Sequence, residues 1–277
     1  MRTYTLSQGG ITAYIRFLRS EERAPATIEK YSHDVRSFAM WLAGRPVTKE
    51  LAAQWKLDLL AEGQAPATVN AKLSAVNGLF RFLGWDDCRV KFLKLQRRVF
   101  RDDSRELSRG EYDQLVGTAC DWLALLLQTI CATGIRVSEV PYITVEAALA
   151  GRAEVSLKGK IRTILLPGKL CRKLLKYARK EKIVSGEIFL TESGKSLSRH
   201  RIWREMKALC KKAGVEASKV FPHNLRHLFA VTFYKVTRDI VKLADVLGHS
   251  SVNTTRIYLL STGAEHARQL ERLGLIN

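Results

Sequence analysis

The chain has 277 residues, enough for two domains of ordinary size, and 46% of them are hydrophobic. This composition supports a buried core, which argues against wholesale disorder. The formal net charge of +19 favours a polyanionic partner, most often nucleic acid, over a merely soluble surface or a membrane-facing patch.

Several other classes of protein find no support in the sequence. No apolar run approaches the length of a membrane span and the N-terminus lacks a signal-peptide pattern, so we expect a soluble, intracellular protein. With a nucleic-acid partner, the expected location is the cytoplasm, in association with the nucleoid. The five cysteines are scattered, odd in number and without a C-x-x-C pair, which argues against a disulfide framework or a zinc site. There is no P-loop and no convincing acidic cluster for Mg²⁺, so we expect no metal and no cofactor.

Residues 1–90 are predicted to form a basic bundle of four helices, because apolar residues recur there at helical spacing. The second and fourth helices start alike, with Ala-Pro-Ala-Thr, and we expect Thr27 and Thr68 to cap them. Lys72 and Arg81 on the fourth helix are candidate phosphate contacts, although each is equally compatible with a solvated side chain.

Residues 91–106 are basic and lose the apolar periodicity, which predicts an extended linker. Such a linker gains free energy along DNA by displacing counterions, but an ordinary charged connector fits equally well. A second domain over residues 107–277 opens at Ser108, which forms a capping box with Glu111.

The stretch ATGIRVSEV carries the first candidate site residues. Gly134 is expected to end one helix, and Arg136 stands where the next begins. Glu139 follows three residues later. On composition alone this pair predicts a surface ion pair, which contributes little to stability.

The next segment contains the β-structure of the chain. Glu154–Leu157 and Thr163–Leu166 are predicted as two short strands, with KGKIR as the turn between them. The predicted fold class is therefore mainly α with a small β-hairpin, in two domains. Lys158 and Lys160 lie in this turn. The topology between Pro141 and Gly151 stays open.

Basic helices follow the hairpin. Lys169–Lys182 is one, and Ser198 is expected to cap another. His200, Arg201 and Arg204 lie near the start of that second helix, where they suit phosphate or base contacts or form a solvated face.

The stretch from Phe221 to Tyr258 is the most informative. Pro222 is suited to the first turn of a helix. An apolar stripe is predicted along that helix and comprises Leu225, Leu228, Phe229, Thr232, Phe233 and Val236. His223, Arg226 and Ala230 share a different face, because residues three and four apart are neighbours.

A second helix, Asp239 to Leu247, is expected to end at Gly248, and His249 follows at once. Ser250 or Ser251 can then cap a short helix that carries Tyr258.

The order His-x-x-Arg, Leu-Gly-His, Tyr and its spacing resemble the C-terminal signature of the tyrosine recombinases, which include phage integrases and Xer-type recombinases. The phrase around Arg136 is similar to the family's first arginine motif. Residues 1–90 resemble its core-binding domain, a helical bundle that grips one side of a DNA duplex.

The resemblance implies a division of labour among six residues. Tyr258 is the nucleophile that forms a 3′-phosphotyrosyl link, while Arg136 and Arg226 bind the phosphate. His223 is the general base, and Lys158 is the acid, with Lys160 as the second candidate. His249 binds a phosphate oxygen or orients Tyr258, and Glu139 supports Arg136.

The resemblance also implies double-stranded recombination sites as partners and a homotetramer on two of them. A type IB topoisomerase-like enzyme and a non-catalytic DNA-binding accessory factor are the alternatives. Integration or excision of a mobile element and resolution of DNA dimers both remain open. The tail from Glu265 to Asn277 docks either into a neighbouring protomer or onto its own domain.

Overall fold

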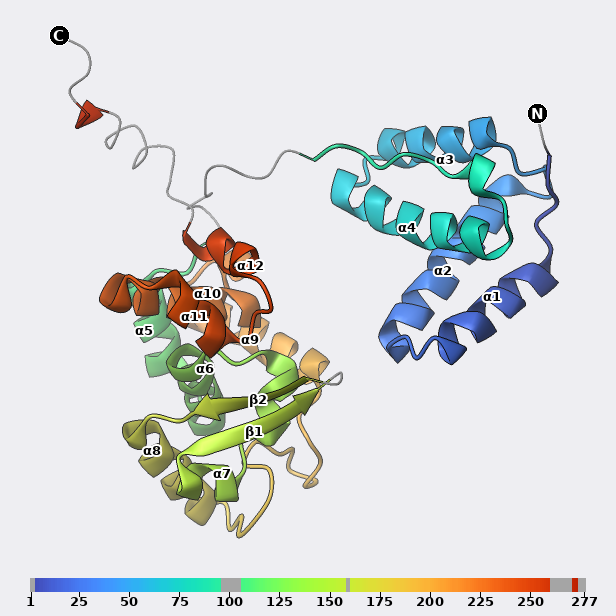
Figure 1. The fold of residues 1–277 in the computed structure, drawn as a ribbon. Helices are drawn as coiled ribbons and strands as arrows, with labels where there is room; N and C mark the ends of the chain where they lie inside the picture. The colour runs from blue at the N-terminus through green and yellow to red at the C-terminus, as the bar shows by residue number, and fades with distance from the viewer. Residues whose placement is uncertain (1–2, 96–105, 158–159, 260–270, 274–277) are drawn as a thin grey trace. The chain divides into compact units, whose positions relative to one another are not determined.

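The chain divides into two compact units, Met1–Arg97 and Arg98–Asn277. A computed structural model describes residues 3–95, 106–157, 160–259 and 271–273 (Figure 1). Within these residues both units are mainly helical, and the sheet that they contain is a two-stranded hairpin. The predicted fold class is confirmed. None of the helices described is both long and apolar enough to cross a membrane.

The N-terminal unit is a bundle of four helices. These are α1 (Gln8–Ser20), α2 (Pro25–Leu42), α3 (Lys49–Ala61) and α4 (Pro66–Phe82), followed by the short η1 (Asp86–Cys88). Phe38 lies at the centre, with its ring 5.0 Å from that of Trp55 and 5.7 Å from that of Phe80.

The predicted caps Thr27 and Thr68 are wrong. α2 and α4 begin earlier, at Pro25 and Pro66, and neither helix has a side-chain cap. Proline at the first helical position has no N–H to satisfy and a backbone angle already suited to the helix.

Of the predicted linker, residues 96–105 lie outside the described part of the chain. The residues just before them are held on α4 by two asparagines. Asn77 accepts from the Val90 N–H at 2.9 Å and donates to the Val90 carbonyl at 2.9 Å. Asn70 makes the same pair of bonds with Leu93.

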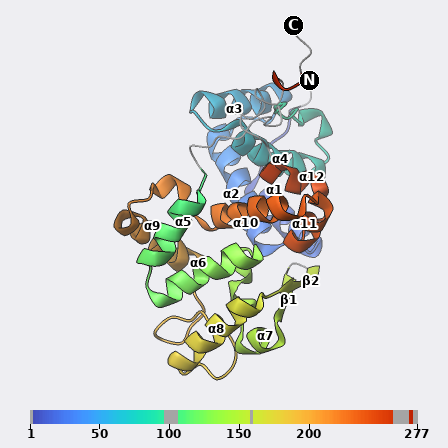
Figure 2. The same cartoon turned by 90° about the vertical axis from the view of Figure 1, so that its left-hand side faces the viewer.

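The C-terminal unit is built around a buried helix, α6 (Asp121–Thr133). Leu126, Leu127 and Ile130 on α6 are fully buried. The helices α5 (Arg109–Thr118), α8 (Gly168–Lys180) and α10 (Pro222–Thr237) pack against it, and α10 also contacts α11 (Ile240–Leu247) (Figure 2). The other helical segments are η3 (Val137–Tyr142), α7 (Val145–Ala150), α9 (Arg199–Ala213), η4 (Ala217–Lys219), α12 (Val252–Arg256) and η5 (Ile257–Leu259).

The hairpin is longer than predicted. Strands β1 (Arg152–Leu157) and β2 (Lys160–Leu165) pair antiparallel, with Val155 opposite Arg162. Ile161 and Arg162 therefore belong to a strand rather than to the turn. Because successive side chains of a strand point to opposite faces, Arg162 shares its face with the buried Ile164.

The apolar stripe predicted for α10 is only partly buried. Leu225 is fully buried, but Val236 is 81% exposed. The buried side of α10 instead carries Arg226 and Ala230, which are 3% and 0% exposed. Helical spacing identified the faces of this helix correctly but not which of them the rest of the unit covers.

Gly134 ends α6 with a φ of +64°, and a Cβ there meets the Phe229 ring at 2.5 Å and Leu247 at 2.9 Å. We expect Gly134→Ala to lower the free energy of unfolding in denaturant titration by more than the conformation alone explains. Gly214→Ala is the matched control, because Gly214 has a φ of +65° with nothing within 4 Å. That control isolates the cost of the left-handed backbone, roughly 1–2 kcal/mol. Equal losses in the two variants would contradict the close packing at Gly134.

Candidate functional site

The site is organised by a buried arginine on α10. Arg226 is 3% exposed and donates from Nη1 to the Gly134 carbonyl and from Nη2 to the Leu247 carbonyl at 2.8 Å. These carbonyls are the ends of α6 and α11, where helix carbonyls have no partner within the helix. Arg226 thus joins three helices while its own charge is desolvated.

His249 lies beside this guanidinium. Its Nε2 is 3.0 Å from Arg226 Nη2, and its Nδ1 is 2.8 Å from the hydroxyl of the buried Thr255. Arginine has only donors, so Nε2 accepts and the proton resides on Nδ1. Burial, together with the charges of Arg226, Arg136, Arg162 and His223, lowers the pKa of His249 to about 4. The imidazole is therefore neutral at neutral pH.

Tyr258 is packed against three histidines and is 3% exposed. Its ring centroid lies 5.8 Å from that of His223, 5.3 Å from that of His227 and 6.0 Å from that of His249, with which it is stacked. Burial lowers the pKa of Arg226 and the charge of Arg136 lowers it further, whereas the nearby Tyr258 hydroxyl opposes both effects. The tyrosine oxygen and the buried guanidinium are therefore neighbours.

Arg136 reaches the site from the start of η3. Its Nη1 donates to Glu139 Oε1 at 3.0 Å, and its backbone N–H donates to Glu139 Oε2 at 2.7 Å. Glu139 is 2% exposed, whereas the Arg136 side chain is 42% exposed. The carboxylate is thus a buried anchor, and the guanidinium remains accessible to a ligand.

His223 stands at the beginning of α10. Although part of its surface is exposed, desolvation of the ring, followed by the charges of Arg226 and Arg136, lowers its pKa. A histidine with a lowered pKa is unprotonated at neutral pH and can accept a proton.

The structure thus brings together Arg136, His223, Arg226, His249 and Tyr258, five of the six residues predicted as catalytic. The sixth, Lys158, lies outside the described residues. Lys160 begins β2, and its side chain is likewise outside the described part.

The other predicted DNA contacts lie elsewhere. Lys72 and Arg81 are on α4 of the N-terminal unit, and Arg81 lines a hollow together with Arg23 and Arg89. The remaining three are at the start of α9: His200, Arg201 and Arg204. Of these, His200 and Arg204 are exposed, whereas the buried Nε of Arg201 has no acceptor among the described residues.

Three neighbours of the site were not predicted. Arg162 shares Glu139 with Arg136, His227 contacts the Tyr258 ring and pairs with Glu106 at 3.6 Å, and Thr255 holds His249. Arg162 could have been found as a charged residue on the buried face of a strand. It was missed because KGKIR, which includes Arg162, was predicted to be a turn.

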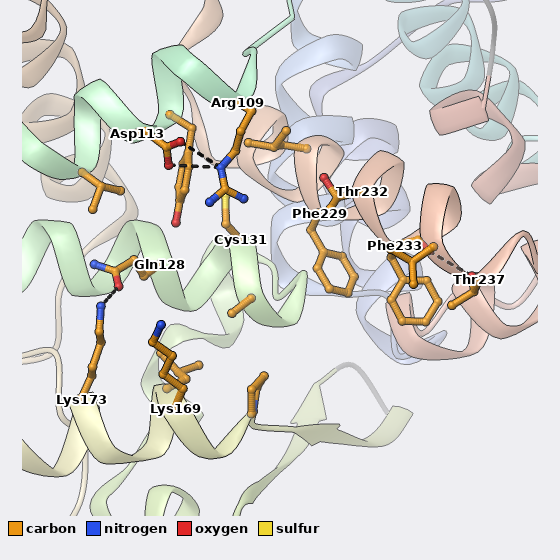
Figure 3. A pocket seen from close by; sticks show the side chains of 17 residues that line it. Arg109, Asp113, Gln128, Cys131, Lys169, Lys173, Phe229, Thr232, Phe233 and Thr237 are labelled. Carbon is orange, nitrogen blue, oxygen red and sulfur yellow. Dashed lines mark hydrogen bonds and ion pairs between the residues drawn. The ribbon is translucent and has the colours of Figure 1, made fainter.

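A pocket of about 650 Å³ in the same unit is lined by different residues. It lies among α5, α6, α8 and α10, and Phe229 and Phe233 face it (Figure 3). Arg109 pairs with Asp113 at its rim. The described residues that line this pocket include none of the six predicted catalytic positions.

With this geometry established, the chain can be compared with known proteins. The phage integrase family matches residues 105–265, and the N-terminal SAM-like domain of phage integrases matches residues 11–87. The chain therefore belongs to the phage integrase family and is a tyrosine-type site-specific recombinase.

Particular relatives include tyrosine recombinase XerA of Thermococcus kodakarensis, 30% identical over 94% of this chain and 93% of that protein. XerA of Pyrococcus furiosus is 28% identical over 100% and 98%. Among solved structures, a lambda integrase dimer bound to a COC′ core site matches with a TM-score of 0.74 and 19% identity, over 92% of this chain and 95% of that one. At this identity the structural likeness supports the fold alone.

We expect His249 in the DNA-free protein to stay neutral from pH 8 down to pH 5. Its folded pKa of about 4 lies below the unfolded value of about 6.5. Between these values the unfolded chain binds the extra proton, so the contribution of His249 to stability is complete above about pH 6.5 and declines toward pH 4. Imidazole NMR signals report this titration, and the loss of one signal in His249→Gln assigns it. A midpoint near 6.5 would contradict the buried, neutral imidazole.

Proposed function

We propose that this recombinase cleaves and rejoins duplex DNA with Tyr258 as the nucleophile. The Tyr258 oxygen attacks the scissile phosphorus, and the bond from phosphorus to the 5′ oxygen breaks. A 3′-phosphotyrosyl link forms, and the 5′ oxygen leaves as a hydroxyl. Rejoining is the reverse step on a second 5′-hydroxyl. Because the link preserves an ester bond, the reaction needs no nucleotide cofactor.

Two guanidiniums suit the charge that this reaction develops. Arg136 and Arg226 bind the non-bridging oxygens through charge-assisted hydrogen bonds. Preorganised cations in a desolvated site lower the barrier by several kcal/mol, on the order of 3 per donor. The burial of Arg226 and the buried carboxylate behind Arg136 support this assignment.

The remaining residues are proposed to accept the proton of Tyr258 and to donate a proton to the 5′ oxygen. The lowered pKa of His223 and its place beside Tyr258 support it as the general base. His249 has its Nε2 engaged as an acceptor, which supports orientation of Arg226 and Tyr258 rather than donation to phosphate. We assign the acid for the 5′ oxygen to Lys158, with Lys160 as the second candidate.

We propose double-stranded recombination sites as the partner, with residues 1–90 as the DNA-binding domain, 91–106 as the basic connection and 107–277 as the catalytic domain. Lys72, Arg81, Lys160, His200, Arg201 and Arg204 are the proposed DNA contacts. The net charge of +19 and the lambda integrase dimer solved on a core site support this partner.

Strand exchange between two duplexes requires more than one active site, so we propose a homotetramer on two sites. Integration or excision of a mobile element and resolution of DNA dimers are both consistent with this chemistry. For either role, we propose that the protein acts in the cytoplasm, in association with the nucleoid.

One observation carries the proposal: Arg136 at the start of η3, His223 and Arg226 on α10 and His249 after α11 gather in one site with Tyr258 in η5. We expect wild-type protein to become covalently attached, through the 3′ phosphate, to a site nicked near the cleavage point, from which a short fragment diffuses away. Tyr258→Phe keeps the ring and removes the oxygen. It should bind the same DNA yet form no adduct that survives denaturant.

Tyr234→Phe is the matched control, because Tyr234 also packs in the small cluster around Tyr258 but lies on α10. It should form the adduct at close to the wild-type rate. An adduct with Tyr258→Phe, or its absence only with Tyr234→Phe, would overturn the assignment of the nucleophile.

A further inference from the structure

Arg162 on β2 contacts two parts of the site at once. Its Nη2 donates to Glu139 Oε2, and its Nη1 donates to the Val246 carbonyl at 3.1 Å. The Arg162 side chain is 15% exposed, and Glu139 is 2% exposed. The contact between Arg162 and Glu139 therefore lies largely out of solvent, where charged hydrogen bonds are stronger than at a surface, whereas the bond to the Val246 carbonyl is exposed.

The first contact holds Arg136. The two oxygens of Glu139 are divided between the guanidiniums of Arg136 and Arg162, and Oε2 also accepts from the Arg136 backbone N–H. Without Arg162, both oxygens of Glu139 are held by Arg136 alone, one through its side chain and one through its backbone. The bond from Arg162 connects this pair to strand β2, and so holds Arg136 relative to the hairpin.

The second contact holds the turn that carries His249. Val246 is in the last turn of α11, two residues before Gly248. A Cβ on Gly248 meets Cδ of Arg162 at 2.6 Å and Nη1 at 2.9 Å, so the guanidinium packs directly on this glycine. His249 is the next residue.

Stability alone is a poor explanation for an arginine at this position. The Nε of Arg162 is buried without an acceptor among the described residues, and a buried donor without an acceptor destabilises the fold. The bonds of Arg162 are also made to Glu139, which pairs with Arg136, and to the end of α11, which precedes His249, rather than to the core of the hairpin.

We propose that Arg162 is a positioning residue: it fixes the position of Arg136 relative to the turn that carries His249, so that both are correctly placed for the scissile phosphate. Arg162 contacts no reacting atom. It acts through Glu139 on one side and through the end of α11 on the other. This inference rests on the proposed phosphate-binding role of Arg136.

The test compares DNA carrying the natural phosphate with DNA carrying a neutral methylphosphonate at the cleavage position. A neutral centre has less need of cationic stabilisation. On natural DNA, Arg162→Ala should bind normally but form the covalent adduct about a hundredfold more slowly, the order expected from misplacing a reacting group. On methylphosphonate DNA the defects of Arg162→Ala and Arg136→Ala should both shrink to within about threefold of wild type. Arg152→Ala, on the exposed end of β1, is the matched control and should behave as wild type on both substrates.

The outcomes separate this inference from the proposed function. If neutral DNA rescues Arg136→Ala but not Arg162→Ala, Arg162 has a structural role only and the inference is wrong. If it rescues neither, the phosphate-binding role of Arg136 fails, and the inference fails with it. Thermal unfolding is measured for each variant. If Arg162→Ala does not fold, Arg162→Gln replaces it, because glutamine keeps one donor for the Val246 carbonyl but no charge.

Discussion

The catalytic unit depends on one buried cation. Arg226 donates to the last carbonyls of α6 and α11 and to His249 at 3.0 Å, and it lies next to the Tyr258 oxygen. Removing one partner of a buried charged hydrogen bond leaves the other unsatisfied. Loss of Arg226 would therefore leave both helix-end carbonyls and His249 without their donor. The guanidinium that closes two helix ends is therefore also the group proposed to bind phosphate. The contacts that organise the site around Arg226 are made by residues of the chain itself.

The charge balance of the site explains its chemistry. Arg136, Arg162 and Arg226 lie close together, and Glu139 is the one carboxylate paired with them among the described ion pairs. Burial, and after it the excess positive charge, lowers the pKa values of His223 and His249. In the proposed mechanism, the scissile phosphate supplies the missing negative charge. The site is thus electrostatically complementary to a charge that arrives with the substrate and increases during its reaction.

Much of what depends on local residues was predicted from the sequence, although the caps Thr27 and Thr68 were wrong. Pro222 begins α10, Gly248 ends α11 and Ser251 caps α12, as expected, because turn and cap chemistry acts within a few residues. What depends on distant partners was missed. The bond between Arg162 and Glu139 spans 23 residues, and only the hairpin register puts Arg162 on the inward face. The stripe on α10 failed for a related reason: periodicity defines a face, but tertiary packing determines whether it is buried.

The most direct measurement is a crystal structure of Tyr258→Phe bound to its uncleaved DNA site. The account predicts that Arg226 keeps its bonds to the Gly134 and Leu247 carbonyls while one of its nitrogens lies about 2.7–3.1 Å from a non-bridging oxygen of the scissile phosphate. Arg136 should contact the same phosphate without leaving Glu139. A phosphate bound away from Arg226, or an Arg226 that must give up both carbonyls to reach it, would contradict a site assembled before DNA binds.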